Sequence, residues 1–330
     1  MNKKVINSPN QNFKFNEDEY LAANPDVARA ITAGAFKSGH EHYTIHGKAE
    51  RRVWGALLTR EGKILSEIDK NGIGLEIGPS HRPIASKKNG YNVHIVDHLD
   101  KSGLIKKYTN HNVNIDNIEE VDFVWTGHPL SKLINKSSHY DWIIASHVIE
   151  HIPDLISFFQ ECEVLLKPDG IISLAIPDKR YCFDCLNPIS STGEILDAFK
   201  EKRITPSPGQ VFNHFANATI RDKNGAWGKN HHGKIELMHS FTQAKDLWSR
   251  ACNGIGYIDV HCWRFISENF RLLINDLKEL GLINLSIIRE FDTVDCEFYV
   301  SLAKYEVESQ SLNERHLVLS DILMKNIVEI

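Results

Sequence analysis

The chain has 330 residues, of which 42% are hydrophobic and 25% are charged, and its formal net charge is -5. This composition is typical of a globular protein with a sizeable core and excludes a disordered chain. Neither an apolar run of the roughly 18 to 20 residues that a membrane span needs nor the apolar block of a signal peptide is found, so we expect a cytoplasmic protein. Lysine and arginine are not clustered, so no nucleic-acid partner is expected.

Cysteine and histidine are the two residue types whose numbers bear on chemistry. Six cysteines are an ordinary number for an intracellular protein. The pair Cys182-x-x-Cys185 has no second pair that would complete a zinc site, so we expect free thiols. The 17 histidines are an unusually large number. Because histidine transfers protons and binds metals near neutral pH, their positions are candidates for a functional site.

Residues 1–55 are predicted to form a separate helical module. The segment Asn24-Pro25-Asp26 supplies a helix start, and Gly34 marks its end. Three histidines follow at positions 40, 42 and 46, without a cysteine or carboxylate at a fixed ligand spacing. We therefore expect these histidines at the module surface and not on a metal.

From about residue 72, short apolar runs alternate with polar or helical sequence. Such runs between helices are typical of a parallel sheet covered on both faces, so the sequence predicts a doubly wound α/β domain over residues 56–305. The runs that we predict as strands are Ile73–Ile77, Val93–Val96, Val121–Trp125, Trp142–Ala145 and Ile171–Ile176.

Residues 178–265 break this alternation with proline, glycine and many aromatic residues, and they predict an insertion of loops and short helices. A helix is expected over residues 268–280, ended by Gly281, and strand-like runs at 285–288 and 298–302 predict a closing antiparallel hairpin. Residues 306–330 are expected to form a helical tail.

A ligand site is predicted where the strands of this sheet end. Gly78 stands in the first strand-to-helix turn, where glycine lets the backbone approach a ligand closely. The turn lacks G-x-G-x-x-G, and Glu76 would repel a pyrophosphate but suit an ammonium group, so a cofactor without phosphates is favoured. Asp97, at the end of the second strand, is placed to accept ribose hydroxyls. Asp122 is a candidate acceptor for an adenine amino group.

Five segments resemble, in order, the motifs of class I S-adenosylmethionine-dependent methyltransferases: LEIGPS at 75–80, HIVD at 94–97, VDFVW at 121–125, DWIIASHVIEHIPD at 141–154 and LLKPDGIISLAIPD at 165–178. The resemblance implies a Rossmann-like sheet of seven strands with S-adenosylmethionine as cofactor. By position, it implies that Glu76 and Gly78 hold the methionine end, Asp97 the ribose, Asp122 the adenine, and Ser146 and His147 the pocket edge. Pro79 and Ser80 depart from the glycine and small residue of many members.

Methyl transfer to a hydroxyl requires a base, and two histidines stand at the end of the fourth strand. If a helix begins there, His147 and His151 lie four residues apart on one face. Packing against the cofactor, proton removal and metal binding together with Glu150 all remain open for them. The resemblance places a Glu-His pair beside the donor, so His151 is the preferred base and His147 the second candidate, and no metal is predicted.

The insertion is expected to bind the acceptor. Asp178, Lys179 and Arg180 follow the fifth strand at the ligand edge, where the two cations would bind a carboxylate or phosphate. Aromatic rings interleaved with hydrogen-bonding side chains are typical of sugar pockets. The residues that we predict for such a pocket are His214, His232, Asp259, His261 and Trp263. Asp259 and His261, with His231 or His232, are also an alternative metal group.

Residues 146–265 resemble a narrower group of bacterial methyltransferases that are encoded with glycan-assembly enzymes. The N-terminal module, with YLAANPDV at 20–27, resembles a module found alongside such enzymes. These resemblances imply O-methylation of a sugar or glycan that caps a surface polysaccharide, with glycan-assembly enzymes as partners. Methylation of a non-sugar metabolite at nitrogen or oxygen is the alternative, and a non-catalytic module that binds S-adenosylmethionine is a third hypothesis.

Overall fold

The computed structural model describes residues 15–50, 52–305 and 310–326. Its centre is a seven-stranded sheet in the order β3-β2-β1-β4-β5-β9-β8. The first five strands are parallel, and β9 runs antiparallel between β5 and β8. The strands are β1 (Ile73–Ile77), β2 (Asn92–Asp97), β3 (Phe123–Val124), β4 (Tyr140–Ser146), β5 (Leu166–Pro177), β8 (Leu285–Val294) and β9 (Glu297–Lys304). The predicted Rossmann-like sheet and its closing hairpin are thus confirmed.

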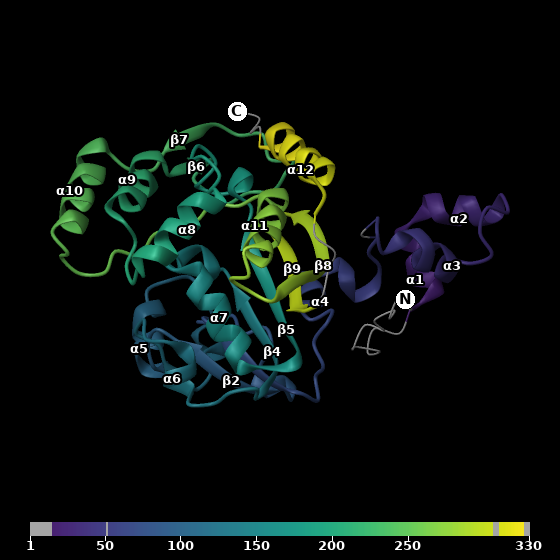
Figure 1. Ribbon diagram of the computed structural model, residues 1–330, viewed down its shortest axis with the longest axis horizontal. Coiled ribbons are helices and arrows are strands. Elements are labelled where there is room, and N and C mark those ends of the chain that lie inside the picture. The colour runs from purple at the N-terminus through teal and green to yellow at the C-terminus, as the bar shows by residue number, and fades with distance from the viewer. Residues whose placement is uncertain (1–14, 51, 306–309, 327–330) are drawn as a thin grey trace.

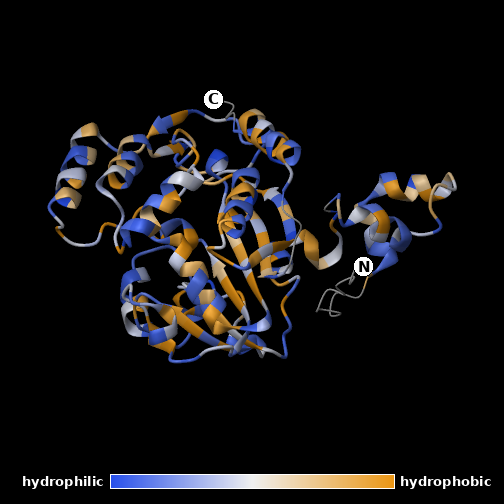
Figure 2. Cartoon of the chain, in the orientation of Figure 1, coloured by the Kyte–Doolittle hydropathy of each residue, from blue (hydrophilic) through white to orange (hydrophobic). Residues whose placement is uncertain are grey.

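Both faces of the sheet are covered, as the apolar runs require. Ile143 and Ala145 of β4 lie in the larger core, and Trp142 and Ile144 lie in a second core on the opposite face. Since side chains of a strand alternate between faces, one apolar run serves both cores. Hydrophobic colour runs along the central strands in Figure 2. The larger core is closed by α6 (Leu130–Ile134), α7 (Leu155–Leu165), α8 (Thr192–Glu201) and α11 (Ser267–Glu279), and the second core includes Ile64 of α4 (Arg60–Ile64).

The N-terminal helices stand beside the sheet (Figure 1). They are α1 (Glu17–Ala23), α2 (Pro25–Thr32), α3 (Gly39–His42) and a π-helical turn, η1 (Tyr43–Gly47). The predicted helix start is confirmed, since Pro25 occupies the first turn of α2. Tyr20 and Tyr43 pack against Trp54 with ring centroids 5.3 and 4.6 Å away. Predictions for residues 1–14 and 51 lie outside the described residues.

One of the three histidines of this module is buried, contrary to the prediction. His40 and His46 are exposed, but His42 is only 5% exposed. Its Nδ1 lies 2.9 Å from the hydroxyl oxygen of Tyr20, which supplies the hydrogen bond that a buried polar ring needs. His42 is therefore part of the packing of the module.

The insertion follows β5 and contains α8, α9 (Pro208–Asn217), α10 (Phe241–Cys252) and a small antiparallel pair, β6 (Thr219–Arg221) with β7 (Ile235–Leu237). Figure 1 shows these elements gathered on one side of the sheet. The short helices were predicted, whereas the strand pair was not. Cys182 and Cys185, at the start of the insertion, are buried free thiols. The other four cysteines are also free thiols.

The last described helix is α12 (Leu312–Lys325), which packs on α11. Arg315 forms an ion pair with Asp276, and the Lys325 ammonium lies 3.0 Å from Glu268. The predicted helical tail is confirmed within residues 310–326, and its remaining positions lie outside the described residues. Over the part of the chain that the structure describes, none of the helices combines the length and apolar character of a membrane span.

Candidate active site

The carboxyl ends of β1, β2 and β4 meet at one edge of the sheet. Gly78, directly after β1, has a φ of +67° and donates its N–H to the Val96 carbonyl over 2.8 Å. A Cβ at this position would lie 2.9 Å from Cγ2 of Val148, in the loop after β4. Both the positive φ and this close approach favour glycine, as predicted for the first turn.

Asp97 ends β2 and is 2% exposed. Its Oδ2 accepts the Ser80 N–H over 2.9 Å, and its Oδ1 accepts the His98 N–H over 2.8 Å. These bonds fix the carboxylate beside the turn after β1. An acid in this position fits the ribose of an adenosine cofactor.

Glu76 faces the second core and not the open edge. It is 1% exposed, and its two carboxylate oxygens accept the N–H groups of Ile84 and Ala85 over 2.7 and 3.0 Å. Burial raises the pKa of Glu76 to about 7. In the structure this carboxylate holds the loop after β1. Its side chain is not accessible at the edge of the sheet for the predicted contact with an ammonium group.

The raised pKa of Glu76 predicts a pH-dependent stability. Because the folded protein holds this proton more tightly than the unfolded chain, the stabilisation is complete below about pH 4.5 and is lost as pH rises through about 7. We expect the free energy of unfolding of the wild type, relative to Glu76→Gln, to fall between these values by up to about 1.4 kcal/mol per pH unit. Urea denaturation at pH 5 and pH 8 measures this. An equal difference in the free energy of unfolding between wild type and Glu76→Gln at pH 5 and pH 8 would mean that the two N–H bonds keep the pKa of Glu76 at its ordinary value.

Asp122 precedes β3 and lies along the side of β2. Its Oδ2 accepts hydrogen bonds from the Ile95 N–H and from the Lys87 ammonium, each over 2.7 Å. Both partners belong to the protein, and Ile95 lies before the carboxyl end of β2. The structure therefore does not bring the Asp122 carboxylate to the predicted adenine position.

The end of β4 carries a network around Glu297, the first residue of β9. Nε2 of His147 lies 2.8 Å from Oε2 of Glu297, and Nε of Arg60 lies 2.5 Å from Oε1. Arg60 also donates to the Ser146 hydroxyl over 2.7 Å. Burial alone would raise the pKa of Glu297, but the hydrogen bonds from His147 and Arg60 lower it to about 2. Burial likewise opposes the charged His147 ring, but Glu297 and Glu150 together raise its pKa.

The helix that would place His147 and His151 on one face is not formed. His147 has a φ of +53°, outside the helical region, and only Ile149–His151 form a single 3₁₀ turn. Pro153 follows, and a proline disfavours helical backbone at the residue before it. His147 and His151 consequently point to different carboxylates, Glu297 and Asp259, and do not share a helix face.

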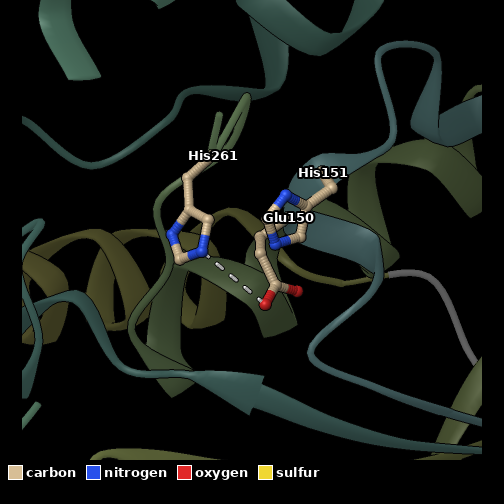
Figure 3. Close-up of side chains that lie close together, drawn as sticks. All are labelled: Glu150, His151 and His261. Carbon is tan, nitrogen blue, oxygen red and sulfur yellow. Dashed lines mark ion pairs between the residues drawn. The ribbon is translucent and has the colours of Figure 1, made fainter. Parts of the chain in front are cut away.

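Glu150, His151 and His261 form a compact cluster, which we call the Glu-His-His cluster (Figure 3). Glu150 is 0% exposed, and neither of its carboxylate oxygens has a hydrogen-bond partner. Nε2 of His261 lies 3.9 Å from Oε1 of Glu150, and the rings of His151 and His261 stand perpendicular with centroids 4.7 Å apart. One potential ligand atom from each residue lies within 4.8 Å of the other two.

Each imidazole of this cluster is held by an outer carboxylate. Nδ1 of His151 lies 2.9 Å from Oδ1 of Asp259, and Nδ1 of His261 lies 2.5 Å from Oδ2 of Asp184. Burial opposes the charge of Asp184, but the His261 ring lowers its pKa. In both histidines Nε2 remains for chemistry or ligation. Nδ1 of His147 lies 3.7 Å from Oε1 of Glu150.

Three predicted acceptor contacts after β5 are corrected, because these side chains are used within the protein. Asp178 is 0% exposed and accepts hydrogen bonds from Arg180 and from the Thr293 hydroxyl. Lys179 is 4% exposed and donates to the Cys185 carbonyl over 3.0 Å. Buried charges are stable only when paired in this way, so these three residues serve structure.

Trp263 is also corrected: it is 1% exposed, lies in the larger core and donates its indole N–H to the Ile152 carbonyl. A buried tryptophan with a satisfied N–H packs and does not offer a face to a sugar. Its neighbours along the chain, Asp259 and His261, are the residues that reach the cluster.

The remaining predicted histidines divide into two places. Nδ1 of His214 accepts the His261 N–H over 3.3 Å, and burial lowers the pKa of His214 to about 4, so this ring is neutral beside the cluster. His232 is exposed, and the neighbouring His231 lies 3.1 Å from Asp222. Within the described ranges the Glu-His-His cluster is the one group of metal-ligand type, so the alternative pairing of His261 with His231 or His232 is not formed.

Several residues at this edge carry no local sequence signal. Arg60 and Glu297 are 237 positions apart, and Asp184 is 77 positions from His261, so no spacing rule links them. His81 offered a weak signal, since it follows the turn after β1. Its Nδ1 is buried without a hydrogen-bond partner, and its ring lies 4.8 Å from that of Tyr108, at the end of α5 (Lys101–Tyr108).

Comparison with solved structures finds many distant similarities. A protein described as a Zn-dependent alcohol dehydrogenase from Rhodobacter sphaeroides has 12% identity and a TM-score of 0.39, and covers 74% of this chain and 88% of its own. One described as an S-adenosylmethionine-dependent methyltransferase from Listeria monocytogenes has 8% identity and a TM-score of 0.39, over 74% and 98% of the two chains. The 1,6-didemethyltoxoflavin-N1-methyltransferase of Burkholderia thailandensis has 10% identity and a TM-score of 0.36, over 88% and 92%.

At such identities and TM-scores these similarities do not decide function. A search of curated proteins gives no match. The family model for a methyltransferase domain matches residues 46–249, more than half of the chain. Gly78 and Asp97 lie in this range, in positions that fit an adenosine-containing donor. The chain therefore belongs to the methyltransferase domain family, and S-adenosylmethionine is its cofactor.

Proposed function

We propose that the protein transfers the methyl group of S-adenosylmethionine to a hydroxyl of a small-molecule acceptor, and that the acceptor is a sugar or glycan. The observation that carries this proposal is the pair of imidazoles after β4, His147 and His151, each held by a carboxylate. They stand at the edge of the sheet where Gly78 and Asp97 also lie. Carboxylate-oriented imidazoles are suited to removing a proton near neutral pH.

S-adenosylmethionine supplies an electrophilic methyl group on a sulfonium. The residues of this chain align the acceptor and take up its proton, and alignment alone contributes a large part of the acceleration in such displacements. A hydroxyl acceptor must lose its proton as its oxygen attacks, whereas a neutral amine is already nucleophilic. Two imidazoles at this edge therefore favour methylation of oxygen over methylation of nitrogen.

We assign proton removal to His147. Its side chain is 40% exposed, and its carboxylate partner Glu297 is 7% exposed, whereas Asp259, the partner of His151, is 65% exposed. A buried carboxylate stabilises the imidazolium that proton uptake creates more strongly than a solvent-screened one. The sequence favours His151 for this role, and in our proposal His151 holds the acceptor end of the site.

The sugar or glycan acceptor is supported by the residues around Asp259. Tyr257 is 55% exposed and lies two positions before this carboxylate, so an aromatic face and a hydrogen-bond acceptor stand together. Sugars present an apolar ring face and hydroxyls to such pairs. The resemblance of the N-terminal module supports the proposed role in capping a surface polysaccharide beside glycan-assembly enzymes.

Transfer of labelled methyl from S-adenosylmethionine to a panel of neutral and acidic sugars, diols, amines and phenols tests the proposal. We expect stable label on a sugar oxygen, assigned by NMR. His147→Gln should lower kcat by roughly 10²- to 10⁴-fold, while His151→Gln should mainly raise KM. Binding of S-adenosylhomocysteine, measured by calorimetry, is the control: both variants should still bind it, because neither substitution removes Gly78 or Asp97. Label on nitrogen, or no transfer to any acceptor, would contradict O-methylation.

A further inference from the structure

We propose that Glu150, His151 and His261 bind a divalent metal ion. The sequence predicts no metal, and the proposal comes from the side chains that the fold brings together from β4's loop and from the end of the insertion (Figure 3). His261 is 110 positions from His151 in the sequence, so only the structure reveals the group.

The first observation is the carboxylate of Glu150, which has no hydrogen-bond partner and has only imidazole nitrogens at 3.7 and 3.9 Å near it. It is fully buried, and neither oxygen accepts a hydrogen bond. Nearly all buried polar atoms in proteins have a partner, and an isolated buried carboxylate is strongly unfavourable. A cation between Glu150 and the two imidazoles supplies that missing partner.

The second observation is the orientation of the two imidazoles. Asp259 holds Nδ1 of His151 and Asp184 holds Nδ1 of His261, which leaves Nε2 of each ring as the ligating atom. Nε2 of His261 lies 3.9 Å from Oε1 of Glu150, a separation that a metal ion between them spans. Histidine ligands of metals almost always donate their other nitrogen to a carboxylate or carbonyl in this manner.

The ligand set indicates the class of metal. Two imidazoles and one carboxylate suit Zn²⁺, Mn²⁺, Fe²⁺ or Co²⁺, whereas Mg²⁺ and Ca²⁺ prefer oxygen ligands. Three protein ligands leave at least one coordination position for a further oxygen. Of the three side chains, His151 is the most exposed, at 33%, so we place this open position on the His151 side of the cluster, where an acceptor can enter.

The role of the open coordination position in methyl transfer rests on the proposed function. A sugar hydroxyl bound to the cation has a lowered pKa, and a neighbouring hydroxyl can occupy a further position, so vicinal diols are the favoured acceptors. The hydroxyl proton passes to His147, and an oxygen electron pair forms the new O–C bond. The C–S bond breaks with its electron pair on sulfur, which leaves neutral S-adenosylhomocysteine.

Metal binding is tested on the full chain without a histidine tag, after EDTA treatment and dialysis. Isothermal titration with ZnCl₂, MnCl₂ and MgCl₂, together with elemental analysis, should give one Zn²⁺ or Mn²⁺ per chain and at least 10-fold weaker Mg²⁺. Glu150→Gln keeps the shape of the side chain and should weaken Zn²⁺ or Mn²⁺ binding at least 100-fold. Asp184→Asn keeps all three ligands but replaces the carboxylate behind the His261 ring by a neutral amide, a weaker hydrogen-bond acceptor, and should weaken binding roughly 10- to 100-fold.

His231→Gln is the matched control, because His231 forms a surface pair with Asp222 outside the cluster and should leave binding unchanged. Wild-type protein that takes up no ion, or Glu150→Gln protein that is folded by circular dichroism and binds as tightly as wild type, would overturn the inference. Methyl transfer is measured separately with and without EDTA. Transfer that persists without metal overturns the catalytic use of the ion but leaves O-methylation standing. Metal binding without any O-methylation supports the site and contradicts the proposed function.

Discussion

Replacing Asp97 by alanine is expected to weaken binding of S-adenosylmethionine and S-adenosylhomocysteine by roughly 10- to 150-fold. The carboxylate is 2% exposed and fixed by the N–H groups of Ser80 and His98 at the end of β2. A hydrogen bond to a charged group contributes about 1.5–3 kcal/mol, which corresponds to this change in Kd. Isothermal titration with S-adenosylhomocysteine measures the loss without interference from turnover.

Asp122→Ala is the matched control for this prediction. The sequence gives both acids a contact with the adenosine part of the donor, but the structure pairs Asp122 with Lys87 and the Ile95 N–H. We therefore expect its donor affinity to stay within about twofold of the wild type. Equal losses in the two variants would return Asp122 to the donor site, and an unchanged Kd for Asp97→Ala would remove Asp97 from it.

The central strands were predictable because their chemistry is local. The predicted run 73–77 coincides with β1, and the runs at 93–96 and 142–145 lie within β2 and β4. Buried parallel strands need apolar side chains on both faces, and such runs are visible in the sequence. The third strand is shorter than predicted, Phe123–Val124, and the Asp122 carboxylate accepts the Ile95 N–H beside it. The β6–β7 pair, only three residues per strand, left no such signal.

The site was predictable in its position along the chain but less so in its geometry. His147 and His151 do follow β4 at the carboxyl edge of the sheet, yet a residue with positive φ and one 3₁₀ turn stand where a helix would have put both rings on one face. The same limit applies after β5, where a Lys-Arg pair suggested anion binding. A buried ion pair and an exposed anion site use the same residue types, and only burial distinguishes them.

The contacts that complete the site are long-range. Arg60 precedes β1 and Glu297 begins β9, yet they meet beside Ser146. Asp184 and His261 come from the two ends of the insertion. Glu150 precedes the base that the sequence favours, but its burial without a hydrogen-bond partner follows from the packing around it and from no pattern in the sequence. Sheet topology brings these residues together, and topology is not encoded in their spacing.

Replacing Asp178 by alanine is expected to lower the free energy of unfolding by about 3–5 kcal/mol, which is a large part of the roughly 5–15 kcal/mol of a typical protein. The fully buried carboxylate accepts hydrogen bonds from the guanidinium of Arg180 and the hydroxyl of Thr293. Without it, the Arg180 charge stays in a site with a side-chain exposure of 12% and has lost its carboxylate. Urea denaturation should show a lower midpoint with an unchanged slope.

Asp259→Ala is the comparison that separates structure from acceptor binding, since the sequence assigns both acids to the acceptor. Asp259 is 65% exposed and pairs with the partly exposed His151, and exposed pairs contribute about 1 kcal/mol or less. We expect Asp259→Ala to retain nearly all of the wild-type stability and to raise KM for the acceptor through the freed His151 ring. Asp178→Ala, measured at a temperature where it remains folded, should show a near-normal KM. A stable Asp178→Ala protein with a raised KM would place Asp178 back at the acceptor. Removing a solvent-exposed carboxylate that binds substrate leaves no unpaired buried charge, so it would raise KM without lowering the stability.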